Sequence, residues 1–209
     1  MPRRRSQHIR EEALRLFRAR GGVLRTSEAI AAGIHPRILY ELKDEGHIEK
    51  IAKGVYALPG LPGINQPDFV VIAKKVPSGI ICLVSALYFH ELTVQIPRCV
   101  DVAVRQSYHP PSISYPPVQF HWFSNAVFEA GIEEHDIGGI DVKVFSQEKT
   151  IVDCFRLRSK VGVDVAVEAL KTYWRQGRTD IDLLRRLAKA SRVLRVMTPY
   201  IETVIHDQS

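Results

Sequence analysis

The segment from Pro36 to Glu45 carries polar side chains at a spacing that suits contact with DNA bases. Arg37 and Tyr40 fall on one face of the expected helix, with Lys43 beside them. The opposite face carries the apolar residues Ile38, Leu39 and Leu42. An arginine fork can bond a guanine edge in the major groove, and a tyrosine can meet a phosphate or a thymine methyl. The pattern predicts a recognition helix in which Arg37 reads a base; Tyr40 has a second interpretation, as an aromatic residue of the core.

The charge of this helix limits what it can do alone. It holds two basic and three acidic residues, so its own charge is about −1. Affinity for a polyanion needs Lys and Arg that release counterions from the phosphates. We therefore expect the affinity to come from Lys50 and Lys53 in a following hairpin, and from a basic N-terminal arm, unstructured before binding, that contains Arg3, Arg4 and Arg5. A solubilising tail is the alternative explanation for that arm.

The elements that position these side chains follow in the order of a winged helix-turn-helix. The sequence predicts a helix over 7–20, a very short strand at Val23 and Leu24, a short helix over 27–32, the helix from Pro36, and a hairpin over 47–58 with Gly54 at its turn. Thr26 and Ser27 are expected to cap the short helix and to lie near DNA. Pro36 suits the first turn of its helix, where a missing amide costs nothing.

The distribution of charge supports the same interpretation. The net charge of the chain is +6, and residues 1–60 hold 12 Lys and Arg against 7 Asp and Glu, a net of +5. The remaining residues hold 17 against 16. The basic excess therefore lies almost wholly in the segment with the helix-turn-helix pattern, as a phosphate-binding surface requires.

Several motifs resemble a known family. The run G-I-x-x-x-x-L-Y-x-L-x-x-x-G-x-I-x-x-I-A-x-G-V-Y, from Gly33 to Tyr56, resembles the winged helix of AbiEi-type antitoxins, which are bacterial transcriptional regulators. The segments CLVSALYFH from Cys82 and FSQEKTIVDC from Phe145 are similar to the C-terminal region of that family. The resemblance extends over most of the chain and is carried mainly by turn glycines and apolar positions.

The resemblance implies a function for each part of the chain. It implies that the winged helix binds double-stranded DNA repeats in the promoter and represses the chain's own operon. It also implies that the C-terminal domain counteracts a nucleotidyltransferase-like toxin. Because antitoxin and toxin of this family are thought not to form a stable complex, direct toxin binding ranks below DNA binding. A homodimer or cooperative pairing on the repeats would add affinity.

A linker separates two predicted domains. Residues 61–67, within a stretch rich in proline and glycine, can continue neither a strand nor a helix. We expect a DNA-binding domain at 1–60 and an effector domain at 68–209. Strands come first in the second domain and helices afterwards, which favours an α+β fold with antiparallel strands and a helical C-terminus.

Composition excludes several classes of protein. No apolar run approaches the roughly 18 residues of a membrane span, and no secretory signal follows the basic N-terminus, so we expect a cytoplasmic protein. Cys82, Cys99 and Cys154 are widely spaced among apolar neighbours and are expected to be buried and free. No spacing typical of a nucleophile, a zinc site or a phosphate-binding loop occurs. We therefore expect no catalytic residues, no metal and no cofactor.

A Mg²⁺-dependent nuclease is the first alternative. Asp141 and Lys143 on a predicted hairpin, with Asp136 and Asp101 as partners, resemble the pattern in which carboxylates hold Mg²⁺ and a lysine steers water. Opposite charges two residues apart on an exposed strand face explain the same pattern. A protein-interaction module that uses its winged helix to bind protein is the second alternative.

Two further features lie near the C-terminus. Asp153 falls on an apolar helix face, so it needs a partner such as Arg156. The last helices are basic, with Arg185, Lys189 and Arg192 on one face. That face is a solvated surface, a second DNA contact, or a docking face for an acidic partner.

Overall fold

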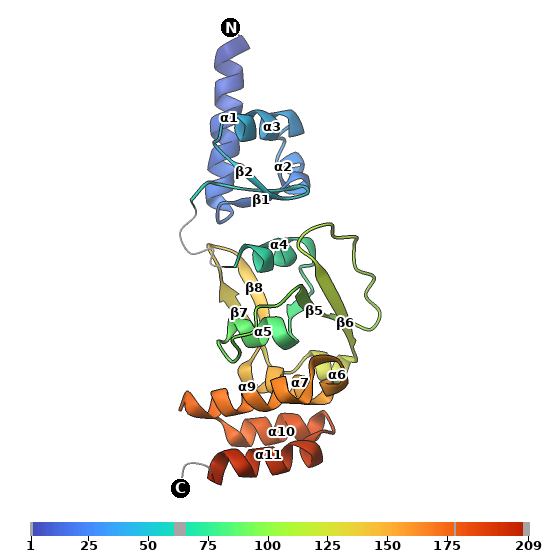
Figure 1. Cartoon of the computed structure of the whole chain (residues 1–209). Coiled ribbons are helices and arrows are strands. Elements are labelled where there is room, and N and C mark those ends of the chain that lie inside the picture. Colours follow the sequence, from blue (N-terminus) through green and yellow to red (C-terminus); the bar gives the residue numbers. More distant parts are fainter. Residues whose placement is uncertain (1, 61–65, 178, 207–209) are drawn as a thin grey trace. The chain divides into compact units, whose positions relative to one another are not determined.

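The computed structural model describes residues 2–60, 66–177 and 179–206, and the side chains of the first helix from residue 8 onward (Figure 1). The chain divides into two compact units, Met1–Pro77 with Pro111–Pro116 and His135–Val142, and Ser78–Pro110 with Pro117–Glu134 and Lys143–Ser209. Most of the expected linker, residues 61–65, lies outside the described residues. The domain boundaries at 1–60 and 68–209 therefore stay predictions.

The N-terminal segment forms a winged helix-turn-helix. Its elements are α1 (Pro2–Ala19), β1 (Val23–Arg25), α2 (Thr26–Ala31), α3 (Pro36–Asp44), β2 (Glu49–Ala52) and β3 (Val55–Ala57). The strands form an antiparallel sheet in the order β1-β3-β2, in which Val23 faces Ala57 and Lys50 faces Tyr56. The predicted order of elements is confirmed, including the short strand that pairs with the hairpin.

Apolar spacing explains how these elements pack. Phe17 of α1 and Leu39 and Leu42 of α3 are all buried in one core. That core contains Ala13, Phe17, Leu24, Ala29, Ile34, Leu39, Leu42, Ile48 and Tyr56. Burial of each such side chain contributes roughly 1.5–3 kcal/mol relative to exposure. The core therefore fixes which face of α3 points to solvent.

The first helix is longer than predicted. We expected an unstructured arm before Gln7, whereas α1 begins at Pro2 and includes the backbone of Arg3, Arg4 and Arg5. Pro is tolerated in the first helical turn, and arginine is a good helix former. The arm is thus a continuation of α1, and the side chains of these arginines lie outside the described residues.

The C-terminal part has the predicted α+β composition and a five-stranded sheet. Its strands are β4 (Ile80–Ile81), β5 (Val100–Arg105), β6 (Val118–Phe123), β7 (Ile132–Asp136) and β8 (Asp141–Phe145), in the order β6-β5-β4-β8-β7. Helix α4 (Pro67–Lys75) belongs to the first compact unit. The helices that follow it are α5 (Leu83–Phe89), α6 (Asn125–Phe128), α7 (Gln147–Arg156), α8 (Arg158–Val161), α9 (Val163–Arg175), α10 (Ile181–Ala190) and α11 (Leu194–His206).

The sheet is mixed. β4 pairs antiparallel with β5, as expected, but β5 and β6 run parallel with Val100 beside Val118, and β4 and β8 are also parallel. Parallel neighbours need a long crossover connection. Residues 106–117 supply it for β5 and β6 as an extended, proline-containing segment without a helix. The alternation of residues within each strand is the same for both directions, so the sequence could not distinguish them.

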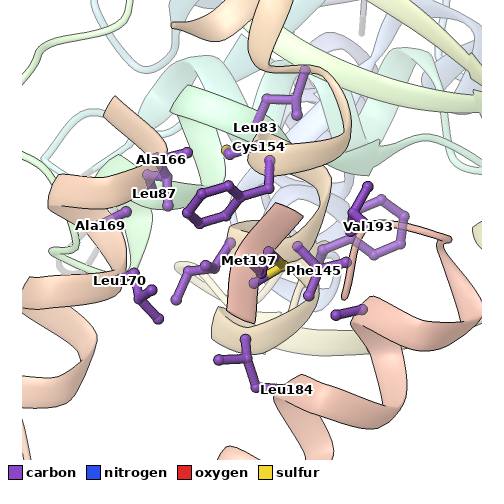
Figure 2. Packing of buried hydrophobic residues seen from close by; sticks show 14 of the residues in the cluster. Leu83, Leu87, Phe145, Cys154, Ala166, Ala169, Leu170, Leu184, Val193 and Met197 are labelled. Carbon is purple, nitrogen blue, oxygen red and sulfur yellow. The ribbon is translucent and has the colours of Figure 1, made fainter. Parts of the chain in front are cut away.

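The C-terminal helices build the larger hydrophobic core. Phe145 of β8 lies among Leu87 of α5, Ala166 of α9, Leu184 of α10 and Met197 of α11 (Figure 2). In Figure 1 the helices α9, α10 and α11 lie next to one another at the red end of the chain. Among the described residues, no helix combines the length and apolar character that a membrane crossing requires.

Candidate nucleic-acid interface

Helix α3, the predicted recognition helix, begins with a side-chain cap from His35 that was not predicted. The Nδ1 atom of His35 accepts a hydrogen bond from the backbone amide of Arg37 at 3.2 Å, and Pro36 occupies the first helical position. One free amide at the start of the helix is thereby satisfied. His35 directly precedes Pro36, which suits the first position of a helix, so the sequence could have predicted that His35 caps this helix.

The face of α3 that points away from the core carries the predicted residues. The Arg37 side chain is 80% exposed and Tyr40 is 54% exposed. Lys43 is also exposed and pairs with Asp44, with 2.7 Å between Nζ and Oδ1. Exposure of Tyr40 rules out its alternative role as a core aromatic. The structure therefore brings Arg37, Tyr40 and Lys43 to one solvent-facing side of a helix.

Arg10 of α1 pairs with two acidic residues, Glu41 of α3 and Glu45 at its C-terminal cap. The terminal nitrogens of Arg10 lie 2.8 Å from Glu41 Oε2 and 2.8 Å from Glu45 Oε1. Glu41 also accepts a hydrogen bond from Arg37 Nε at 2.9 Å. The charge of −1 counted for the isolated helix is thus not the charge of its surroundings. The sequence did not identify Arg10 as a partner of these acids, because the contact joins residues far apart in the chain. The excess of acidic residues in the predicted helix was the one indication that a basic partner was needed.

These ion pairs act on the ionisation of the groups involved. Hydrogen bonds from Arg10 and Arg37 lower the pKa of the Glu41 carboxyl, so it is ionised at neutral pH. The adjacent Asp44 carboxylate raises the pKa of Lys43, so that side chain is cationic. The helix therefore carries paired charges of both signs, and Arg37 is the most exposed of these side chains.

The hairpin β2–β3 is joined to the start of α2. Both the backbone amide and the hydroxyl of Thr26 donate to the carbonyl of Gly54, at 2.9 and 3.4 Å. Gly54 has φ of 73°, which explains the glycine at this turn. Lys53, beside it, and Lys50 of β2 are exposed, as is Ser27. Of the predicted wing residues, Lys53 therefore lies at the turn beside the start of α2, whereas Lys50 lies further along β2, opposite Tyr56.

The predicted capping by Thr26 and Ser27 is wrong in detail. Arg25 holds the capping position of α2, and its backbone amide donates to Glu28 Oε2 at 2.8 Å. The hydroxyl of Thr26 instead donates a hydrogen bond to the carbonyl of Gly54. A tertiary hydrogen bond has therefore replaced the local one that the sequence predicts.

Three of the residues of the nuclease alternative have partners other than one another. Asp136 accepts a hydrogen bond from the Gly139 amide within the β7–β8 turn, and Lys143 lies 3.7 Å from Glu134. Asp101 bonds His121 Nε2 at 2.8 Å. No cluster of three metal-ligating side chains occurs in the part of the chain that the structure describes. These positions give no support to a Mg²⁺ site.

The buried charges of the C-terminal part are structural. Asp153 is fully buried, accepts a hydrogen bond from Arg156 Nε at 3.0 Å, and forms an ion pair with the buried Lys149. The predicted pairing of Asp153 with Arg156 is confirmed, and Lys149 was missed. All three cysteines are free; Cys82 and Cys154 are buried as expected, whereas Cys99 is half-buried.

The comparisons with known proteins agree with this geometry. A family model described as "Transcriptional regulator, AbiEi antitoxin" matches residues 11–59, so the predicted resemblance is confirmed over the winged helix. The search of curated proteins found no match. Among solved structures, the chain is similar to the RV2827C protein from Mycobacterium tuberculosis, with a TM-score of 0.52 and 17% identity over 86% of this chain and 73% of that one. This likeness shows a shared fold, and the family match covers the winged-helix segment alone.

Proposed function

We propose that this chain is a DNA-binding transcriptional regulator of the AbiEi antitoxin type, which represses its own operon and counteracts a nucleotidyltransferase-like toxin. It acts in the cytoplasm on repeats in its promoter and performs no catalysis. The winged helix at 1–60 binds DNA, and the domain at 68–209 provides the antitoxin activity.

One observation carries the proposal. The segment that matches the regulator family folds with α3 exposing Arg37, Tyr40 and Lys43 on the side opposite its core. A helix-turn-helix uses this arrangement to place side chains in the major groove. Arg10 and Arg37 together balance the charges of Glu41 and Glu45, so the acidic residues counted for this helix do not argue against DNA binding.

The binding residues fall into two roles. Arg37 and Tyr40 select the sequence, because they project from the recognition helix. Phosphate contacts supply the affinity and carry no sequence information. We assign these to Arg3, Arg4 and Arg5 at the start of α1, to Thr26 and Ser27 at the start of α2, and to Lys43, Lys50 and Lys53. Pro36 has no N–H to donate, so we assign it only a packing contact with the DNA at the start of α3.

Gel-shift assays with the chain's own promoter test this proposal. We expect binding that weakens steeply as salt rises, and a reporter under that promoter should be repressed when the protein is expressed. Arg37→Ala should reduce repression, and a scrambled promoter of equal length is the control. Absence of salt-dependent binding would instead favour the protein-interaction alternative.

The antitoxin activity needs a separate test. Growth of cells that express a nucleotidyltransferase-like toxin from an adjacent reading frame should be restored by co-expression of this chain. The proposal places direct complex formation below DNA binding, so rescue is expected without stable co-purification. A homodimer, or cooperative binding at paired repeats, would appear as steep occupancy of a two-repeat probe relative to a single repeat.

A further inference from the structure

Glu41 lies between two arginines and uses both of its carboxylate oxygens. Oε1 accepts a hydrogen bond from Arg37 Nε at 2.9 Å, and Oε2 accepts one from Arg10 Nη2 at 2.8 Å. The other terminal nitrogen of Arg10 lies 2.8 Å from Glu45. Arg10 thereby anchors Glu41 to α1, so the carboxylate that meets Arg37 is fixed at a second point.

The contact with Glu41 leaves the two terminal nitrogens of Arg37 free to bind a base. Only Nε is engaged by Glu41, and the side chain remains 80% exposed. Within the described residues, no hydrogen bond or ion pair occupies the two terminal nitrogens of Arg37. Those nitrogens form the fork that can bond O6 and N7 of a guanine together.

We propose that Glu41 is a positioning residue for base reading, which aims the fork of Arg37 at guanine and is itself held in place by Arg10. This inference rests on the proposed function, because it assigns the base class and the support of the same DNA-reading helix. An arginine that is ordered before binding loses less rotamer freedom on binding. A restrained Arg37 side chain cannot change rotamer to form hydrogen bonds with a different base, and this raises selectivity for guanine.

A surface ion pair between residues four apart on a helix is the simpler explanation of the same contact, and such pairs contribute little to stability. The two explanations predict different effects on DNA binding. A carboxylate near the phosphates repels them, so its removal should strengthen binding to any sequence. If Glu41 positions Arg37, its removal should also weaken discrimination between bases. Affinity and selectivity would then move in opposite directions.

Glu41→Ala in the full chain tests the inference, with Glu45→Ala as the matched control. Each change removes one carboxylate and one partner of Arg10, from α3 for Glu41 and from its C-terminal cap for Glu45, but only Glu41 contacts Arg37. The probe is a duplex library of randomised sequence from which the wild-type protein enriches a site, followed by single-base variants of that site. The position read by Arg37 is the one at which Arg37→Ala loses its preference. Melting temperatures verify that the variants are folded.

We expect wild-type protein to prefer guanine at that position, and Glu41→Ala to reduce the preference about 5- to 10-fold. Its affinity for a non-specific duplex should be equal to or higher than that of wild type. Glu45→Ala should keep the preference within about twofold. The double variant Glu41→Ala/Arg37→Ala should show no more loss than Arg37→Ala alone, because the two side chains act as one unit.

Two results would overturn the inference while leaving the proposed function intact. The first is full guanine preference in Glu41→Ala, and the second is an equal loss of preference in both glutamate variants. Failure of the wild-type protein to enrich any site, together with an absence of salt-dependent binding, would reject the proposed function itself.

Discussion

Asp153 is the carboxylate on which the polar interior of the C-terminal part depends. Its two oxygens are shared between Arg156 and the buried Lys149, whose ammonium group also lies 4.4 Å from the ring centre of Phe145. Burial lowers the pKa of Lys149, and the charge of Asp153 opposes that shift. The pair is therefore sensitive to the loss of its acidic member.

We expect Asp153→Ala to destabilise the protein by about 3–5 kcal/mol, because it leaves Lys149 buried without its counter-charge. Lys149→Met should cost less, since Asp153 keeps Arg156 as a partner and the methionine fills a similar volume. Urea denaturation monitored by circular dichroism measures both values. A larger loss for Lys149→Met than for Asp153→Ala would show that Arg156 does not compensate Asp153.

The cysteines make a second prediction at the residue scale. Burial raises the pKa of the Cys82 and Cys154 thiols well above the usual value, and it also excludes reagents. In the native protein at neutral pH, a thiol-specific reagent should therefore modify only the half-buried Cys99. All three thiols should react in urea. Cys99→Ser is the control, and rapid native modification of that variant would contradict the burial of the other two.

At the scale of elements, the wing should supply affinity without sequence preference. Lys53 stands exposed at the hairpin turn that Thr26 ties to α2. Lys53→Gln should weaken binding to all sequences alike and reduce the slope of log K against log salt by about 0.9, the value for one phosphate contact. Fluorescence anisotropy over a salt series measures this slope. Glu49→Gln on the same hairpin is the control and should not reduce it; an unchanged slope for Lys53→Gln would remove the wing from the interface.

The start of α1 makes a stronger prediction of the same kind. Arg3, Arg4 and Arg5 continue the helix, so they act from an ordered backbone rather than from a free arm. Replacing all three with glutamine should reduce the salt slope by up to about 2.7 if each contacts a phosphate. Equal slopes for this variant and wild type would identify the segment as a solubilising extension.

The sequence predicted the elements better than their tertiary partners. Val100, Val102 and Val104 alternate with other residues in β5, which is the pattern of a strand, and two prolines directly precede β6. The parallel pairing of these strands, the use of Thr26 by Gly54, and the ion pairs of Arg10 join residues far apart in sequence, so no local pattern encodes them. The reading face of α3 was predictable because one helix contains both its polar and its apolar side. Its electrostatics were not, because they depend on α1.

At the scale of the whole molecule, the proposal assigns repression and antitoxin activity to different parts of the chain. Arg37→Ala alters an exposed side chain whose removal leaves the core of the winged helix unchanged. A full-length variant with Arg37→Ala and Lys53→Gln should therefore lose most repression of a promoter reporter and still rescue cells from the toxin. Both readouts should be taken from strains with equal antitoxin levels, set by an independent promoter and checked by immunoblot.

The same separation should hold in the opposite direction. Asp153→Ala, which is expected to weaken the fold of the C-terminal part, should impair rescue more than it impairs DNA binding by the winged helix. A folded variant with an altered DNA-binding surface that loses both activities at equal protein level would show that toxin control requires DNA binding. Loss of rescue in the Arg37→Ala and Lys53→Gln variant would therefore contradict the assignment of antitoxin activity to residues 68–209 and place it in the regulation of the operon.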